Sequence, residues 1–60
     1  MQNLRLQFRE LTTMNLLYKV ESTLIPFVGN IVMIDKEQFE IQKVIISFDK
    51  SVILCYGKIL

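Results

Sequence analysis

Residues 43–60 read KVIISFDKSVILCYGKIL. Two apolar, β-branched runs flank a polar turn at Asp49-Lys50-Ser51, and this pattern predicts a β-hairpin. Both runs are apolar at consecutive positions, whereas a strand with one face in solvent would alternate with polar residues. The second apolar face therefore needs cover, and we expect a partner or a second copy of the chain to provide it.

The turn allows two registers of this closing hairpin. With a three-residue loop, Ile45 faces Cys55 on the outer side of the hairpin and Ile53 lies beside them. With a two-residue loop, Ile53 and Cys55 turn inward instead. The outer set is then Ile45, Val52, Leu54 and Tyr56. Because both registers leave apolar side chains on the outer face, the expected interaction surface does not depend on the choice between them.

Alternating apolar and polar residues predict two strands at the start of the chain, from Leu4 to Arg9 and from Asn15 to Ser22. Their register places three apolar pairs on one face: Phe8 with Leu16, Leu6 with Tyr18, and Leu4 with Val20. A helix over this N-terminal third is the alternative, because Leu4, Phe8 and Leu11 also have helical spacing.

Breakers interrupt the middle of the chain between Thr23 and Asn30. Pro26 disfavours a central strand, and Gly29-Asn30 can supply a positive φ for a bend. We expect an extended crossing segment that covers one end of the sheet. A short third strand, apolar on both faces, follows from Ile31 to Ile34.

The fourth strand is the longest, from Gln38 to Phe48, and a bulge near Gln42-Lys43 would bring its two apolar sets to one face. The expected fold is all-β: a five-stranded antiparallel meander that curls into an SH3-like, partly closed barrel with a bulged long fourth strand. Residues 1–60 are expected to form a single small β domain.

The small size of the chain limits its stability. A domain of 60 residues buries only about 60% of the surface that its unfolded chain exposes. Cys55 is the only cysteine and histidine is absent, which excludes an internal disulfide and argues against a structural zinc site. A hydrophobic fraction of 52% then points to self-association, and we expect a homodimer.

The charge pattern argues against nucleic acid as the main partner, because seven basic and six acidic residues are spread along the chain without a basic run. A nucleic-acid-binding barrel remains the alternative, with Arg5, Arg9 and Lys19 gathered on one face of the sheet. The sequence contains no apolar run long enough for a membrane span and no signal-peptide core, and a lone cysteine suits a reducing compartment. We therefore expect a cytoplasmic protein.

The sequence lacks the motifs of an enzyme, with no histidine, nucleophile motif, phosphate-binding glycine loop or paired carboxylates. We expect no catalysis and no cofactor. Asp35, Glu37 and Asp49 are interpreted as turn residues rather than metal ligands, because acidic turn residues are far more common. Cys55, in an apolar strand, is interpreted as a buried structural residue.

Most of the aromatic residues are in phase with the expected core, namely Phe8, Tyr18, Phe39, Phe48 and Tyr56. Phe27 is the exception, because it lies beside Pro26 in an irregular segment, and it is either a lid on the core or a contact for a partner. For the dimer interface we predict the remaining outward apolar residues, Leu17, Ile45, Ile53 and Cys55.

The stretch PFVGNIVMID, residues 26–35, followed by Phe39-Glu40-Ile41, Val44 and the hairpin at 48–53, resembles very short SH3-like β proteins of bacteriophages and bacteria. In that pattern a Pro-x-x-Gly-Asp segment introduces a strand, and Asn30 stands here in place of the Asp. The resemblance implies a phage accessory protein that binds and inhibits a bacterial anti-phage defence protein, as small dimeric inhibitors of the Hachiman system do. If a phage encodes the chain, its expected location is the cytoplasm of the bacterial host cell. A structural subunit of a larger assembly is a further alternative.

Overall fold

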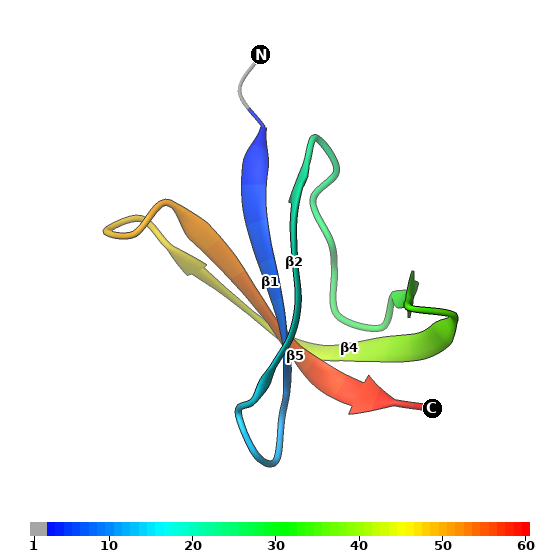
Figure 1. Cartoon of the computed structure of the whole chain (residues 1–60). Helices are drawn as coiled ribbons and strands as arrows, with labels where there is room; N and C mark the ends of the chain where they lie inside the picture. The colour runs from blue at the N-terminus through cyan, green and yellow to red at the C-terminus, as the bar shows by residue number, and fades with distance from the viewer. Residues whose placement is uncertain (1–2) are drawn as a thin grey trace.

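The computed structural model describes residues 3–60 and contains five strands, so Met1 and Gln2 lie outside the described residues (Figure 1). The strands are β1 (Leu4–Glu10), β2 (Leu16–Ser22), β3 (Ile31–Ile34), β4 (Glu37–Ser47) and β5 (Val52–Ile59). The all-β fold class is confirmed. The helix alternative for the N-terminal third is wrong, because the two segments with apolar–polar alternation form β1 and β2.

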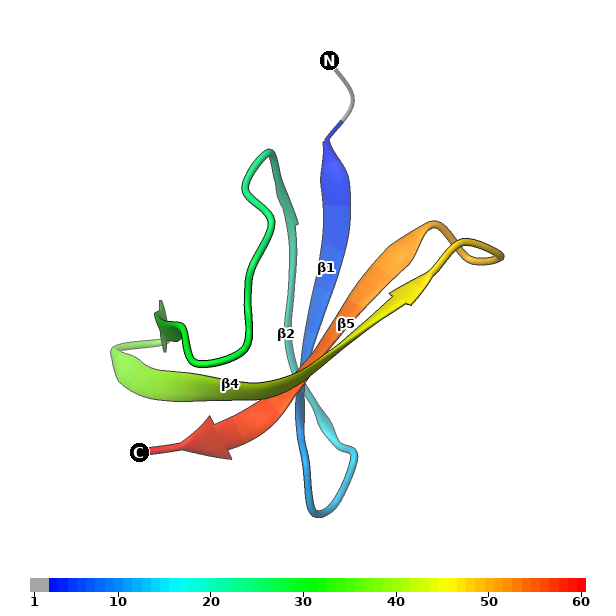
Figure 2. The ribbon, with the colours of Figure 1, turned by 180° about the vertical axis from the view of Figure 1, so that it is seen from behind.

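The strands form one mixed sheet in the order β2-β1-β5-β4-β3, strongly twisted and curled into a half-barrel (Figures 1 and 2). The expected antiparallel meander is wrong in one respect: β1 and β5 pair in parallel, while the other three pairs are antiparallel. The consecutive strands β2 and β3 therefore lie at opposite edges, and residues 23–30 cross from one edge to the other.

The central place of β5 follows from its sequence, because a strand that is apolar on both faces is stabilised where it has neighbours on both sides. Ile53 and Cys55 belong to the buried core on the inner face of the sheet. Val52 and Tyr56 point to the outer face, yet each is only 7% exposed. The prediction for the two-residue loop, in which Val52 and Tyr56 belong to an exposed outer set, is thus wrong for these two residues.

Long polar side chains on the neighbouring strand β1 account for this burial. Val52 has Arg5 as its register partner, and Tyr56 has Arg9. The aliphatic stems of arginine cover apolar neighbours while their guanidinium groups stay in water. The chain thus covers much of the second apolar face of β5 by itself.

The closing hairpin adopts the register expected for the shorter loop, since Ile46 pairs with Ile53 and Val44 with Cys55. β4 ends at Ser47 and β5 begins at Val52, so residues 48–51 form the turn, with Ser51 at a φ of 54°. Phe48 consequently lies at the tip, 87% exposed. Its assignment to the core is wrong because the strand ends one residue before it.

The first hairpin keeps the predicted faces but shifts by two residues, so that Phe8 pairs with Tyr18 and Leu6 with Val20. A shift of two preserves the side-chain alternation, which explains why the faces were predicted correctly and the partners were not. The Phe8 and Tyr18 rings lie 6.5 Å apart between centroids. Leu17 is the extra residue of a bulge opposite the Phe8–Arg9 step.

The predicted bulge in β4 is confirmed between Ile41 and Lys43. The crossing segment attaches there, because the Gly29 amide donates to the Ile41 carbonyl oxygen at 2.8 Å and the Ile41 amide donates to the Asn30 carbonyl oxygen at 2.9 Å. Gly29 has a φ of 94°, which also confirms the predicted bend. The bulge thus fixes the end of the connection that precedes β3.

The core is small and lies on the inner face of the half-barrel. Its members are Leu6, Phe8, Ile34, Phe39, Ile41, Ile53 and Cys55. The Phe8 and Phe39 rings meet edge to face at 5.7 Å, an arrangement favoured by their quadrupoles. Within residues 3–60, sixteen large hydrophobic residues are exposed, so the structure still leaves much apolar surface in solvent.

Candidate binding surfaces

The four residues predicted for a dimer interface occupy different environments. Ile53 and Cys55 are buried in the core, because the observed register turns them inward. Leu17 is half-buried and packs against that core, while Ile45 is exposed. Ile53 and Cys55 therefore offer no surface to a partner in this conformation, and the predicted patch is reduced to Ile45.

The apolar surface instead gathers at the open side of the half-barrel, in a groove of about 430 Å³ between β2 and the segment that leads into β3. Leu24 is 76% exposed and Met33 65% exposed along this groove. Most of the lining is apolar: Leu6, Phe8, Tyr18, Val20, Leu24, Ile25, Pro26, Val32, Met33 and Ile34, with Glu21, Ser22 and Asn30. We call it the apolar groove.

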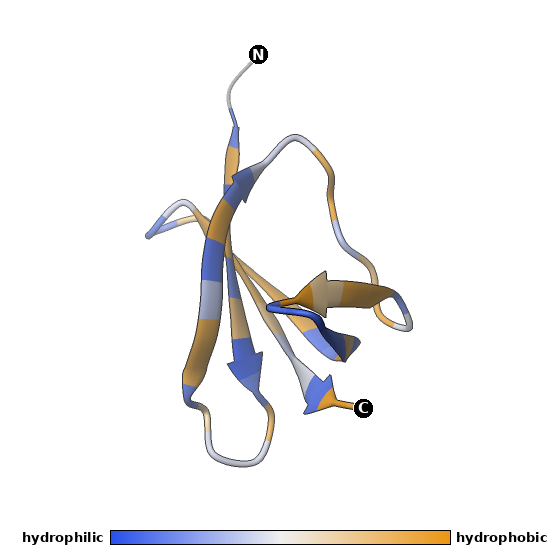
Figure 3. Cartoon of the chain, turned by 45° about the vertical axis from the view of Figure 1, so that its right-hand side comes forward, coloured by the Kyte–Doolittle hydropathy of each residue, from blue (hydrophilic) through white to orange (hydrophobic). Residues whose placement is uncertain are grey.

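The groove exists because the barrel is not closed. β2 and β3 are the two edge strands, and the connection between them contains Pro26, which cannot donate a ladder hydrogen bond. Figure 3 shows that hydrophobic residues make up β3 and recur along the connection and along β2. Because β2 and β3 do not pair with each other, the exposed side chains among these residues face solvent rather than a partner strand.

Two exposed phenylalanines lie outside the apolar groove. Phe27 is 66% exposed, so it is a surface residue and not a lid on the core, and its amide donates to the Oδ1 atom of Asn30 at 2.9 Å. Phe48, at the tip of the β4–β5 hairpin, borders a smaller hollow of about 210 Å³ with Leu4 and Ile46. The exposure of Phe48 could not be predicted from the sequence, because Phe48 continues the apolar alternation of β4.

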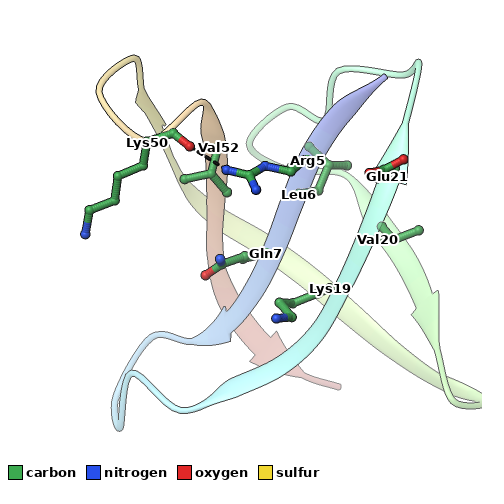
Figure 4. Close-up of a pocket in the computed structure, with 8 residues that line it drawn as sticks. All are labelled: Arg5, Leu6, Gln7, Lys19, Val20, Glu21, Lys50 and Val52. Carbon is green, nitrogen blue, oxygen red and sulfur yellow. Dashed lines mark hydrogen bonds between the residues drawn. The ribbon is translucent and has the colours of Figure 1, made fainter. Parts of the chain in front are cut away.

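The outer face of the sheet has a different, polar hollow of about 440 Å³ between β1, β2 and the β4–β5 turn (Figure 4). It is lined by Arg5, Leu6, Gln7, Lys19, Val20, Glu21, Lys50 and Val52. In Figure 4 the Lys19 side chain reaches from β2 toward β1, while the Lys50 side chain points away from the hollow.

Arg5 and Arg9 both have a structural role on this outer face. The Arg5 Nη2 atom donates to the Lys50 carbonyl oxygen at 2.6 Å, and its Nε atom donates to the Ser51 carbonyl oxygen at 3.4 Å. The Arg9 Nη1 atom donates to the Met14 carbonyl oxygen at 2.9 Å. Arg5 thus links the β4–β5 turn to β1, and Arg9 links the β1–β2 turn to β1. Together with Lys19, they lie on the outer face, as the nucleic-acid alternative requires.

The acidic side chains are placed apart. Asp35 and Glu37 lie at the β3–β4 turn, whereas Asp49 lies at the opposite end of β4. Across residues 3–60, no three histidine, cysteine, aspartate or glutamate residues are close enough to hold a metal ion. Burial raises the pKa of the Cys55 thiol to about 11, so the thiolate is scarce at neutral pH.

The described residues also contain no helix with the length and apolar character needed to cross a membrane. Comparison with protein-family models, curated proteins and solved structures finds no match to this chain.

Proposed function

We propose that the chain is a non-catalytic protein-binding module, a homodimer of the phage accessory type that inhibits a bacterial defence protein by binding to it. The observation that carries the proposal is the apolar groove, whose exposed side chains lie beside the unpaired edge of β2. Contiguous exposed apolar surface of this kind is uncommon on monomers and usually marks an interaction site.

A second copy of the chain is the occupant that we propose for the groove. An isologous interface places the same patch on both subunits, so two β2 edges can meet in antiparallel fashion and each copy covers the apolar side chains of the other. Val20 and Tyr18 alternate along β2 on the groove side and would form the centre of this contact. Burial of apolar area stabilises such a contact by about 25 cal/mol per Å².

Light scattering at tens of micromolar tests the dimer. We expect the mass of two chains for the unmodified protein and a shift toward monomer for Met33→Asp, because a buried, unpaired carboxylate opposes assembly. Met14→Asp is the matched control: Met14 is 52% exposed, lies outside the groove lining and has a φ of 67°, which aspartate tolerates. A strictly monomeric mass for the unmodified chain would refute the dimer.

For the contact with a defence protein we propose the two exposed phenylalanines that the groove leaves free, Phe27 and Phe48. Large aromatic side chains are frequent anchors of protein interfaces. The resemblance of residues 26–53 to short phage proteins supports a host defence protein as the target.

A plating assay tests the inhibition. Bacteria that carry a Hachiman defence system are challenged with a phage that the system blocks, with and without expression of the chain. We expect the chain to restore plaques and Phe27→Ser or Phe48→Ser to abolish the effect at equal protein level, while Met14→Asp retains it. Plaque counts that are unchanged by the unmodified chain would exclude inhibition of that system.

A further inference from the structure

The basic residues, scattered in the sequence, gather on the outer face of the folded sheet. Five of the seven basic residues point outward from the strands: Arg5, Arg9, Lys19, Lys43 and Lys58. Only two of the six acidic residues share this face, Glu21 and Glu40. The remaining acidic residues lie at turns and at the end of β1. A chain with a net charge of +1 therefore has one distinctly basic face.

The two acidic residues lie at the margins of this face. Glu21 is the register partner of Arg5, and Glu40 is the register partner of Lys58. The middle of the face holds Lys19 on β2, Arg9 on β1 and Lys43 on β4, with the neutral Gln7 and Tyr56 as their register partners. We call Lys19, Arg9 and Lys43 the cationic band. It crosses four strands, a width of about 14 Å at the usual strand spacing.

We propose that the cationic band binds the phosphate backbone of a nucleic acid. The charges are spread across the sheet rather than converging on one point, which suits a polymer of regularly spaced phosphates better than a single small anion. Tyr56 is only 7% exposed between Arg9 and Lys43, so it cannot stack on a base. Binding through phosphates alone is independent of base sequence.

The surface of this face favours nucleic acid over an acidic protein. Protein interfaces have an apolar core inside a polar rim, whereas nucleic-acid interfaces are more polar and positively charged. Here the apolar Val52 and Tyr56 are already buried by neighbouring side chains and Leu54 is half-buried. Of the outward apolar residues on the three central strands β1, β5 and β4, Ile45 alone is exposed, which is too little for an apolar interface core. The apolar groove, by contrast, is lined mainly by residues of the inner face and by none of the three residues of the cationic band, so the two proposed activities use different surfaces.

Fluorescence anisotropy with a labelled single-stranded oligodeoxythymidine tests the proposal. We expect binding at low salt that weakens as salt rises, with a log–log slope of about −2 for three phosphate contacts on a single strand. Substitution of Lys19 or Lys43 by glutamate should weaken binding about fivefold or more and reduce that slope by about 0.7. Neither lysine donates a side-chain hydrogen bond within residues 3–60, so folding should be unaffected.

Lys36→Glu is the matched control, because it changes the net charge equally but lies in the β3–β4 turn, away from the outer face. We expect Lys36→Glu to leave the affinity for the oligonucleotide nearly unchanged. The neutral variants Lys19→Gln and Lys43→Gln should reduce the affinity less than the glutamate variants at the same positions. Equal losses in all three glutamate variants, or absence of binding at low salt, would overturn the proposal. Tighter binding of polyglutamate than of the oligonucleotide would overturn it in favour of an acidic protein partner.

Discussion

The Phe39 ring lies directly over Gly57: a Cβ atom added to that glycine would be 2.9 Å from the ring Cζ atom and inside contact distance of the Glu40 carbonyl oxygen. Gly57 pairs with Ile41, next to the bulge of β4. The glycine is required for space rather than for a left-handed backbone, because the β4 backbone at Glu40 and the fully buried Phe39 ring both lie against it.

Gly57→Ala is therefore expected to destabilise the fold by about 3 kcal/mol or more, since backbone and a packed ring cannot move away cheaply. Urea denaturation followed by circular dichroism measures the loss. Gly29→Ala is the matched control: its site is open, and only the positive φ of 94° resists a side chain, at a cost of about 1 kcal/mol. Equal losses for the two variants would contradict the close approach.

Lys36→Gly is expected to stabilise the protein by about 1 kcal/mol, because Asp35 and Lys36 form a two-residue hairpin turn with φ values of 50° and 70°. Glycine adopts this left-handed conformation without strain. Thermal unfolding should show a higher midpoint for the variant. Lys50→Gly, at a turn position without a positive φ, should instead lower the midpoint. The reverse order would rule out strain in the β3–β4 turn.

Arg5→Met should loosen the closing hairpin, because it removes the hydrogen bonds to the Lys50 and Ser51 carbonyl oxygens but keeps a long apolar stem over Val52. For an exposed contact the expected loss is about 1 kcal/mol. Hydrogen exchange should localise the effect to residues 48–53. Lys19→Met, on the same face but without such a bond, serves as the comparison, and similar exchange in both variants would argue against the fastening role.

Alkaline pH should destabilise the protein through Cys55. Its pKa is about 11 in the folded chain against 9.0 for the free thiol, because burial disfavours the thiolate. Between these values the unfolded chain has lost the thiol proton while the folded chain retains it, so the free energy of unfolding falls as pH rises from 9 to 11. The slope is about 1.4 kcal/mol per pH unit.

Cys55→Ala supplies the reference for this measurement. The variant should be less stable at neutral pH because of the cavity that it leaves, but the gap between the two proteins should narrow from pH 9 upward. Urea midpoints at several pH values measure that gap. A gap that stays constant up to pH 11 would show that the thiol ionises normally in the folded chain.

Local patterns in the sequence predicted the strands, the β4 bulge and the bend at Gly29, because alternation and breakers act over a few residues. The parallel pairing of β1 with β5 could not be predicted in the same way. It depends on which strand buries the most apolar surface when it has a neighbouring strand on both sides. The inward position of Ile53 and Cys55 followed from one of two registers that the turn left open. Phe48 was misplaced because alternation does not show where a strand ends.

The candidate surfaces could be predicted only in part, because they too depend on pairing between strands that are far apart in the sequence. Arg5, Arg9 and Lys19 were placed on one face by alternation within a single hairpin. Lys43 joins them only through the pairing of β4 with β5 and of β5 with β1. The apolar groove depends on β2 and β3 lying at opposite edges, and no local pattern encodes that arrangement.

The parallel pair of β1 and β5 also has a consequence for biosynthesis. During translation β1 can form a hairpin with β2 as soon as both have left the ribosome, but its other edge stays open until β5 has emerged. An isolated two-stranded hairpin is marginally stable in water. The nascent chain therefore cannot build the native sheet strand by strand as it is synthesised. Folding is completed only when β5 pairs with β1, which joins the last strand to the first.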